Sequence, residues 1–204
     1  MTLTWYGHSC FLVETARARV VLDPYEPGSV PGLALPALTA DLVLCSHGHH
    51  DHCWADGVTL SGKAASCTVA AVDTFHDEVQ GAKRGTNKIH ILDFDGVRVV
   101  HLGDLGHVLT PEQAAAVGRP DVLLIPVGGY YTIDPAEAKQ VTEQLQPKVI
   151  IPMHYRGAGF GYEEIGPVAE FTKLFERVQT VPGSTVTWSP ALSGVILPET
   201  PKQN

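Results

Sequence analysis

The chain has 204 residues, of which 44% are hydrophobic and 18% are charged, and its formal net charge is −8. This length and composition predict one globular domain over residues 1–204 and exclude a disordered chain. The acidic balance argues against nucleic acid and anionic membranes as partners, so a small-molecule substrate is expected, with a homo-oligomer left open.

The ends and the cysteines of the chain bear on its location. Met1-Thr2-Leu3-Thr4 lacks the basic and long apolar regions of a secretory signal, and no apolar run is long enough to span a bilayer. Cys10, Cys45, Cys53 and Cys67 form no Cys-x-x-Cys pair, which is typical of a reduced, cytoplasmic protein. Two of them flank a histidine-rich run and are interpreted as packing residues rather than thiolate ligands.

Three short runs rich in β-branched and aromatic residues, at 2–7, 10–15 and 18–22, predict the first strands. Their connections are too short for parallel crossovers, so an antiparallel meander is expected. His8 interrupts the first two strands, at a point where a side chain can be directed into a cleft, and is a candidate catalytic residue. Residues 26–40, rich in proline and glycine, predict a long loop that could act as a lid.

The most informative run reads Ser-His-Gly-His-His-Asp-His and follows the apolar run 41–45, which predicts a buried strand. Its imidazoles and carboxylate are ligands that zinc and its first-row neighbours accept. Because side chains alternate along a strand, His47 and His49 are expected to point to one side and hold one ion. The turn that follows would present Asp51 and His52 to a second ion.

The spacing His47-x-His49-x-Asp51-His52 resembles the signature of the metallo-β-lactamase superfamily. The run Tyr6–Phe11 and the pair Asp23-Pro24 are similar to the branch that contains the ascorbate-6-phosphate lactonase-like hydrolases. The resemblance extends from about residue 3 to about residue 157. It implies an α/β (α+β) fold, the αββα sandwich of two mixed β-sheets flanked by helices, with the metal site at one edge.

The run 65–72 predicts a strand that leads to His76. Because His76 follows its strand as His47 follows the earlier one, it is expected to be the third ligand of the first ion. The alternatives for that position are His90, His101 and His107. Of these, His90 lies inside an alternating strand and is expected on its solvent face.

Residues 78–87 place Lys83 and Arg84 among glycines and next to the expected metal site. Backbone amides and cations both favour phosphate, so this segment could hold an anionic group; a solvated loop is the competing interpretation. The runs 89–94 and 97–102 are joined by a dipeptide, Asp-Gly, that is typical of a tight β-hairpin.

This hairpin leads to Asp104, which is bracketed by Gly103 and Gly106. Glycines allow a tight turn that brings a carboxylate inward. The superfamily's bridging aspartate falls at this position, so we expect Asp104 to bridge the two ions as a metal ligand and, with Asp51, as a catalytic residue. His107 is close enough to Asp104 in the sequence to lie behind the metal ligands.

A helix is predicted at 111–117, a buried strand at 121–127, and a second helix from an N-cap at Asp134 to about residue 145. A strand at 148–151 precedes His154, which is therefore expected to join Asp51 and His52 on the second ion.

Three further side chains near these strand ends are candidates for substrate contact. Arg156 could bind a phosphate or carboxylate, with a surface ion pair as the alternative. Tyr130 and Tyr131 could polarise a substrate oxygen, with simple packing as the alternative. The tail is expected to form a helix near 163–177 and strands near 185–188 and 195–197, without chemistry of its own.

This ligand set predicts a metal-dependent hydrolase with two divalent ions, most simply zinc, with manganese, iron or nickel as alternatives. A water shared by two cations loses a proton near neutral pH, and the hydroxide would attack a small lactone or a phosphorylated small molecule. A phosphodiesterase or nuclease is the first alternative, against which the acidic surface weighs. A non-hydrolytic redox or scaffold protein is the second. In the oxygen-reducing branch a glutamate commonly replaces His49, so this residue favours hydrolysis.

Overall fold

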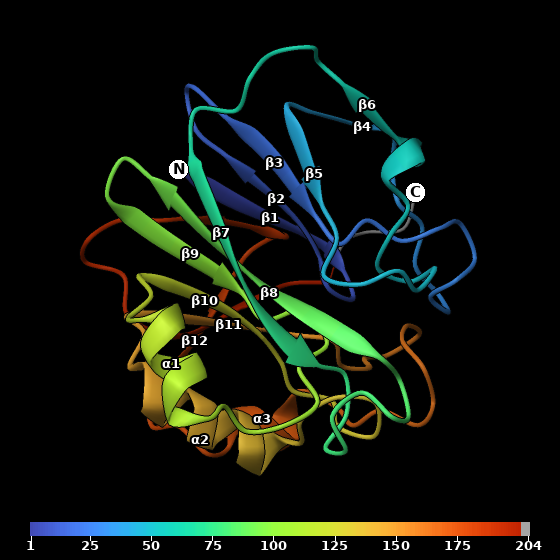
Figure 1. Ribbon diagram of the computed structural model, residues 1–204, viewed down its shortest axis with the longest axis vertical. Coiled ribbons are helices and arrows are strands. Elements are labelled where there is room, and N and C mark those ends of the chain that lie inside the picture. The colour runs from blue at the N-terminus through green and yellow to red at the C-terminus, as the bar shows by residue number, and fades with distance from the viewer. Residues whose placement is uncertain (201–204) are drawn as a thin grey trace.

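The computed structural model describes residues 1–200, in which two large β-sheets face each other (Figure 1). The five-stranded sheet has the strand order β13-β1-β2-β3-β5, and the seven-stranded sheet has the order β12-β14-β11-β10-β9-β8-β7. A small third sheet pairs β4 with β6. The strands are β1 (Thr2–Gly7), β2 (Cys10–Glu14), β3 (Arg19–Leu22), β4 (Leu38–Ala40), β5 (Leu42–Leu44), β6 (Val58–Leu60), β7 (Thr68–Phe75), β8 (Thr86–Phe94), β9 (Val97–His101), β10 (Val122–Pro126), β11 (Val149–Met153), β12 (Val178–Val181), β13 (Thr185–Thr187) and β14 (Gly194–Pro198).

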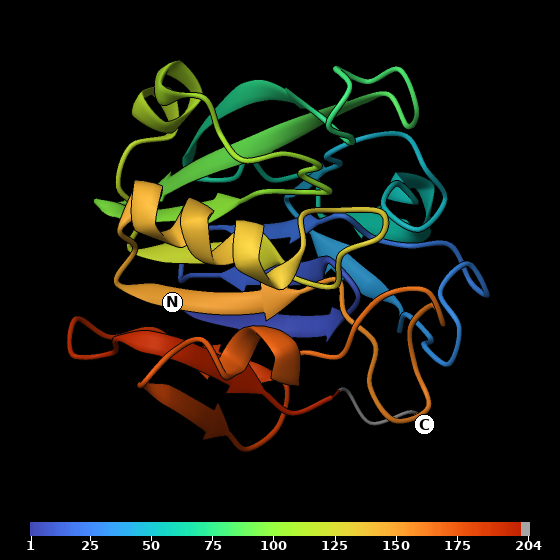
Figure 2. The same cartoon turned by 90° about the horizontal axis from the view of Figure 1, so that it is seen from below.

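The helices lie mainly on the outer face of the seven-stranded sheet, as Figures 1 and 2 show. They are η1 (Ala55–Gly57), α1 (Pro111–Val117), α2 (Pro135–Leu145) and α3 (Ala169–Thr172). The predicted sandwich of two mixed sheets with flanking helices is confirmed. On the side of the five-stranded sheet, the helical content of residues 1–200 is the single turn η1 beside β6 (Figure 1). No helix in this range is both long and apolar enough to cross a membrane.

Local sequence signals account for several of these elements. The first three strands form the expected antiparallel meander. The hairpin of β8 and β9 turns at Asp95 and Gly96, which both adopt positive φ, at 54° and 87°, as a primed turn requires. Helix α2 begins with a capping box, in which Asp134 accepts from the backbone of Glu137 and the Glu137 side chain accepts from that of Asp134.

Three predicted elements differ from the structure. The loop predicted at 26–40 ends at residue 37, because Leu38–Ala40 forms β4 and pairs with β6. The helix expected near 163–177 is wrong, since only Ala169–Thr172 is helical. Gly166 and Pro167 precede this short helix, and β12 begins immediately after 177 to pair with β14, so the chain has little room for a longer helix. The strand at 41–45 is half-buried rather than buried, because β5 is the edge of its sheet.

The direction of the strands determines where the site forms. β7 and β9 both run antiparallel to β8, and β9, β10 and β11 are mutually parallel neighbours. The carboxyl ends of β7, β9 and β11 therefore lie at the same edge of the seven-stranded sheet. The loop after β5 in the facing sheet meets them there. Four segments that are far apart in the sequence thus converge at one edge of the sandwich.

Candidate metal centre

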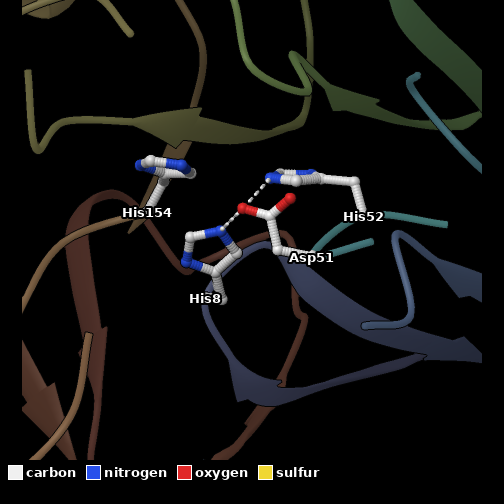
Figure 3. A group of neighbouring side chains, drawn as sticks. All are labelled: His8, Asp51, His52 and His154. Atoms are coloured by element: carbon white, nitrogen blue, oxygen red, sulfur yellow. Dashed lines mark ion pairs between the residues drawn. The ribbon is translucent and has the colours of Figure 1, made fainter. Parts of the chain in front are cut away.

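All seven predicted metal ligands gather at this edge. The ligand atoms of His47, His49 and His76 lie within 4.8 Å of one another, as the first ion would require. The ligand atoms of Asp51, His52 and His154 form a second group, in which they also lie within 4.8 Å of one another. His8 belongs to this second group as well (Figure 3). The Nε2 atom of His8 lies 3.3 Å from Oδ2 of Asp51. The structure therefore brings the two predicted triads together and adds His8 to the second.

Asp104 lies between the two groups. Its Oδ2 atom is 3.2 Å from Nε2 of His76 and 3.9 Å from that of His47, both in the first triad. The same oxygen is 3.1 Å from Nε2 of His52 and 3.2 Å from that of His154, both in the second. Burial opposes ionisation of this carboxyl group, yet the neighbouring imidazoles hold the pKa of Asp104 well below its ordinary value. A buried carboxylate at the meeting point of two histidine groups is what a bridging ligand requires.

The donor set fits metal ions, and within residues 1–200 several of its buried atoms lack a hydrogen-bond partner, which a bound cation would replace. Nε2 of His47, Nε2 of His52 and Oδ1 of Asp104 are buried and have no hydrogen-bond partner among the described residues. An unpartnered buried polar atom costs about 1–3 kcal/mol, so native structures keep few of them. Imidazole nitrogen and carboxylate oxygen are ligands of zinc and neighbouring metals, and these atoms face the centre. The residues present therefore fit two divalent cations.

Asp23 orients one ligand from each triad. Its Oδ2 atom accepts from Nδ1 of His52 at 2.8 Å, which leaves Nε2 of that ring free for a metal. The same oxygen accepts from Ser46 Oγ at 2.6 Å, and that hydroxyl accepts from Nδ1 of His47 at 2.9 Å. Burial opposes ionisation, yet His101 and the hydrogen bond from His52 lower the pKa of Asp23 to about 2. Asp23 was not assigned this role from the sequence, because it lies 23 positions before Ser46.

Asn87 and His101 hold the turn that carries Asp104. The Asn87 Oδ1 atom accepts from the backbone N–H of Asp104 at 2.9 Å, and its Nδ2 donates to Thr74 and to the carbonyl of Leu102. His101 donates from Nε2 to the carbonyl of Ser9 and accepts from the N–H of Gly103. His101 therefore supports the bridging carboxylate from behind and lies outside the first triad, for which it was an alternative.

The other two alternative ligands also lie outside the triads. His90 was expected on a solvent face, and this is wrong: it is 5% exposed, and its Nε2 donates to the carbonyl of Cys45 at 2.9 Å. The loop after β5 covers that face of β8 and buries it. His107 donates from Nδ1 to the carbonyl of Val108, and its Nε2 accepts from the backbone of Phe75, next to His76. It lies behind the ligands, where the sequence suggested.

His8 and His154 occupy strained backbone positions. Both have left-handed conformations, with φ of 49° and 52°, which cost a non-glycine residue of the order of 1 kcal/mol or more. The carbonyl of His8 accepts from Nε1 of Trp5 at 3.0 Å and from the N–H of His154 at 3.1 Å, which compensates part of this cost. Burial, with His154 alongside, lowers the pKa of His8 to about 4, so its ring is neutral at neutral pH.

A cavity of about 310 Å³ opens over the centre. It is lined by His49, Asp51, His76, Arg84, Asp104, Tyr131, His154 and Tyr162. Tyr162 was not singled out from the sequence; its hydroxyl lies 3.1 Å from Oδ2 of Asp51 and donates to the carbonyl of Ser29 at 2.7 Å. Arg156 lines a different hollow, and Tyr130 is exposed at the surface. Of the candidate substrate contacts, the cavity therefore includes Tyr131 and Arg84.

The long loop that precedes β4 lies beside this cavity. Ser29 contacts Tyr162, and the carbonyl of Pro31 accepts from the N–H of Gly161 at 2.9 Å. Gly32 packs so closely on the backbone of Gly159 that an added Cβ would lie 1.8 Å from its carbonyl oxygen. These contacts fasten the loop to the segment around Tyr162.

Cys45 and Cys53 form a disulfide bond, so the prediction that the cysteines are unpaired is wrong for these two. The chain turns back after the ligand run, because the N–H groups of His52 and Cys53 both donate to the carbonyl of His49. This turn brings the two cysteine Cα atoms to 5.3 Å, a separation typical of disulfides. Cys10 and Cys67 are free. Because each sulfur of the pair is bonded to the other, neither is a metal ligand.

Cys45→Ala should therefore lower stability and spare the metal centre. The bond closes a short loop, which predicts a loss of about 2–3 kcal/mol in the free energy of unfolding under oxidising conditions. Urea unfolding with and without dithiothreitol measures this, and the difference between variant and parent should shrink in the reductant. Cys67→Ala, at a free cysteine, is the matched control. A Cys45→Ala protein that no longer retains metal would overturn the ligand assignment.

The comparisons with known proteins agree with this geometry. Residues 2–154 match the family described as the beta-lactamase superfamily domain. A UPF0173 metal-dependent hydrolase of Archaeoglobus fulgidus is 33% identical over 193 residues, covering 76% of this chain and 83% of that protein. A crystal structure of a proposed zinc-dependent hydrolase of the metallo-β-lactamase superfamily from Thermotoga maritima is 37% identical, with a TM-score of 0.80 over 98% of each chain.

These matches, with the sandwich and the histidine-rich centre, define a class of protein. The chain belongs to the metallo-β-lactamase superfamily. CmlA, a diiron β-hydroxylase from Streptomyces venezuelae, shares the fold with a TM-score of 0.51 at 15% identity, over 75% of this chain and 44% of its own. Because one fold holds hydrolases and a hydroxylase, the reaction has to be argued from the site.

Proposed function

We propose that this chain is a metal-dependent hydrolase that uses two divalent cations to cleave a small lactone or a phosphorylated small molecule. One observation carries the proposal: four histidine Nε2 atoms, two from each triad, lie within 3.9 Å of one carboxylate oxygen of Asp104. Proteins with similar sequences that are named metal-dependent hydrolases support the reaction class.

In this proposal each triad would hold one ion, and Asp104 would be a ligand available to both. His47, His49 and His76 would bind the first cation, and Asp51, His52 and His154 the second. When bound, the cations supply Lewis acidity, which brings the pKa of a shared water toward neutrality and polarises the bond to be cleaved. Zinc is the first choice for this donor set, and manganese, iron and nickel also accept it.

The protein groups around the cations have separate tasks. Asp51 and Asp104 line the cavity and remain the catalytic candidates. We assign His8 a positioning role in place of a catalytic one, because its side chain is buried behind Asp51 and does not line the cavity. As a neutral imidazole it can donate from Nε2 to Asp51. The phenol of Tyr162 stays protonated, since burial and the Asp51 charge raise its pKa, and its one O–H donates to the carbonyl of Ser29 and so fixes the ring at the cavity wall.

The size of the cavity, about 310 Å³, supports a small molecule over a nucleic-acid strand. The net charge of −8 supports the same choice and gives the alternative phosphodiesterase or nuclease little attraction for phosphate backbones. We further propose that residues 1–204 act as one domain in the cytoplasm, either alone or as a homo-oligomer. A reducing cytoplasm would favour the dithiol form of Cys45 and Cys53.

Metal reconstitution with a substrate panel tests the proposal. The protein is stripped with a chelator and reloaded with zinc, manganese, iron or nickel. It is then assayed on lactones, phosphorylated sugars, bis-p-nitrophenyl phosphate and a β-lactam. We expect turnover of a lactone or a phosphorylated substrate that disappears on chelation and returns on reloading. Activity on bis-p-nitrophenyl phosphate alone would favour the phosphodiesterase, and a redox-active iron centre without hydrolysis would favour the non-hydrolytic protein.

A further inference from the structure

Among residues 1–200, Arg84 is the only lysine or arginine that lines the metal cavity. It comes from the loop between β7 and β8, which follows His76 directly and lies at the lower end of these strands in Figure 1. The guanidinium lies over the ring of Tyr131, with its central carbon 5.6 Å from the ring centroid. A fixed positive charge thus faces the same space as the two proposed cations.

The loop that carries Arg84 is held in shape by one carboxylate. Asp77 accepts four backbone N–H groups at 2.8–2.9 Å, from Val79, Gly81, Lys83 and Arg84. The carbonyl of Gly85 then accepts from the N–H of His76, which closes the loop onto a metal ligand. Arg84 is therefore fixed relative to the centre.

The guanidinium retains unused hydrogen-bonding capacity. Among the described residues, Arg84 forms no ion pair, and its Nη2 donates to one acceptor, the carbonyl of Tyr130, at 3.0 Å. A guanidinium has five N–H donors, so most of them are available. The adjacent Lys83 differs, since its ammonium pairs with Glu78 at the surface. Both side chains are positively charged, so they differ in position: Arg84 lines the cavity, and Lys83 lies at the surface.

We propose that Arg84 binds an anionic group of the substrate, a carboxylate or a phosphate, while the metal centre holds the bond to be cleaved. Arginine matches both anions through two parallel N–H···O bonds, and stacking on Tyr131 orients the plane of its fork. The surface charge of −8 repels anions, so their recognition depends on this local site. The inference rests on the proposed function and narrows it to anionic substrates, with Arg84 as the specificity determinant.

Anion binding tests this without relying on turnover. Inorganic phosphate and succinate are titrated calorimetrically into the metal-loaded parent protein and its variants. Arg84→Gln should weaken binding of at least one anion by about 10- to 100-fold, the usual range for a lost charge-assisted hydrogen bond. The anion affinity of Arg84→Lys should lie between those of the parent and of Arg84→Gln, because lysine keeps the positive charge but cannot form two parallel hydrogen bonds. The matched control is Lys83→Gln, which removes the same charge from the next residue and should stay within about twofold.

The two anions separate the two chemistries: weaker phosphate binding assigns the site to a phosphate, and weaker succinate binding assigns it to a carboxylate. Metal content is measured in every variant, so that a misfolded centre is recognised. Unchanged binding of both anions by Arg84→Gln, or equal weakening in Lys83→Gln, would overturn the inference.

Kinetics distinguish failure of this inference from failure of the proposed function. On matched esters with and without a carboxylate, Arg84→Gln should raise KM for the anionic one only. Anion binding that depends on Arg84, without hydrolysis of any substrate, would remove the hydrolase and keep the anion site. Hydrolysis of both esters that does not depend on Arg84 would keep the proposed hydrolase and remove the anion site.

Discussion

Asp104→Ala should release the metal ions and lower kcat/KM by more than about 100-fold, beyond the usual effect of changing a group that merely supports a ligand. Its Oδ2 atom is the common neighbour of four histidine Nε2 atoms, at 3.1–3.9 Å. Without it, the first triad retains only imidazoles, and two divalent charges in one buried pocket lose their shared neutralising ligand. Metal content after dialysis, measured by inductively coupled plasma mass spectrometry, reports this directly.

Asp73→Ala is the matched control for this variant. Asp73 lies on β7, the strand that leads to His76, but its side chain is 81% exposed and pairs with Lys88 at the surface. It should keep the full metal content and activity. An Asp104→Ala protein that retained two equivalents of metal would show that the carboxylate does not bridge.

Asp23→Asn should weaken metal binding by about 10- to 100-fold, the range found when a group behind a metal ligand is changed. The carboxylate accepts from His52 directly and reaches His47 through Ser46, so one substitution disturbs a ligand of each ion. An asparagine amide that places its NH₂ group toward His52 would oppose the Nδ1–H with a second donor. The other tautomer of His52 would then be favoured, and its Nε2 would carry a proton where the metal should bind.

Chelator competition separates this positioning role from a purely structural one. The variant should lose metal to the chelator at lower concentration than the parent, and zinc affinity should fall more than the stability of the metal-free protein. Ser46→Ala removes the link to His47 but leaves that to His52, so its effect should be smaller. A loss of melting temperature with unchanged metal affinity would contradict the positioning role.

The sequence was most informative where the determining interactions are local. The turn at Asp95-Gly96 and the capping box at Asp134 are set by residues within a few positions of each other. The run His47–His52 is similarly compact, and its spacing alone indicated a metal centre. For the distant residues His76 and His154, the shared feature was their position just beyond a strand end. The parallel directions of β7, β9 and β11 explain why that feature was sufficient.

The sequence was least informative where contacts are made between distant segments. Asp23 acts on a loop more than twenty residues away, and nothing in its own neighbourhood indicates this. The face of His90 was misassigned because the loop after β5 covers β8, which alternation within one strand does not reveal. The pairing of Cys45 with Cys53 depends on the turn of the ligand run. Arg84 and Arg156 were both candidates for binding an anionic group, and the loop around Asp77 places only Arg84 at the cavity.

Metal stoichiometry and position test the central claim most directly. A crystal of the zinc-loaded protein, with anomalous diffraction recorded on both sides of the zinc absorption edge, locates every bound ion. We predict two ions per chain, one among His47, His49 and His76 and one among Asp51, His52 and His154, with Asp104 contacting both. A single ion, or ions bound away from Asp104, would contradict this prediction.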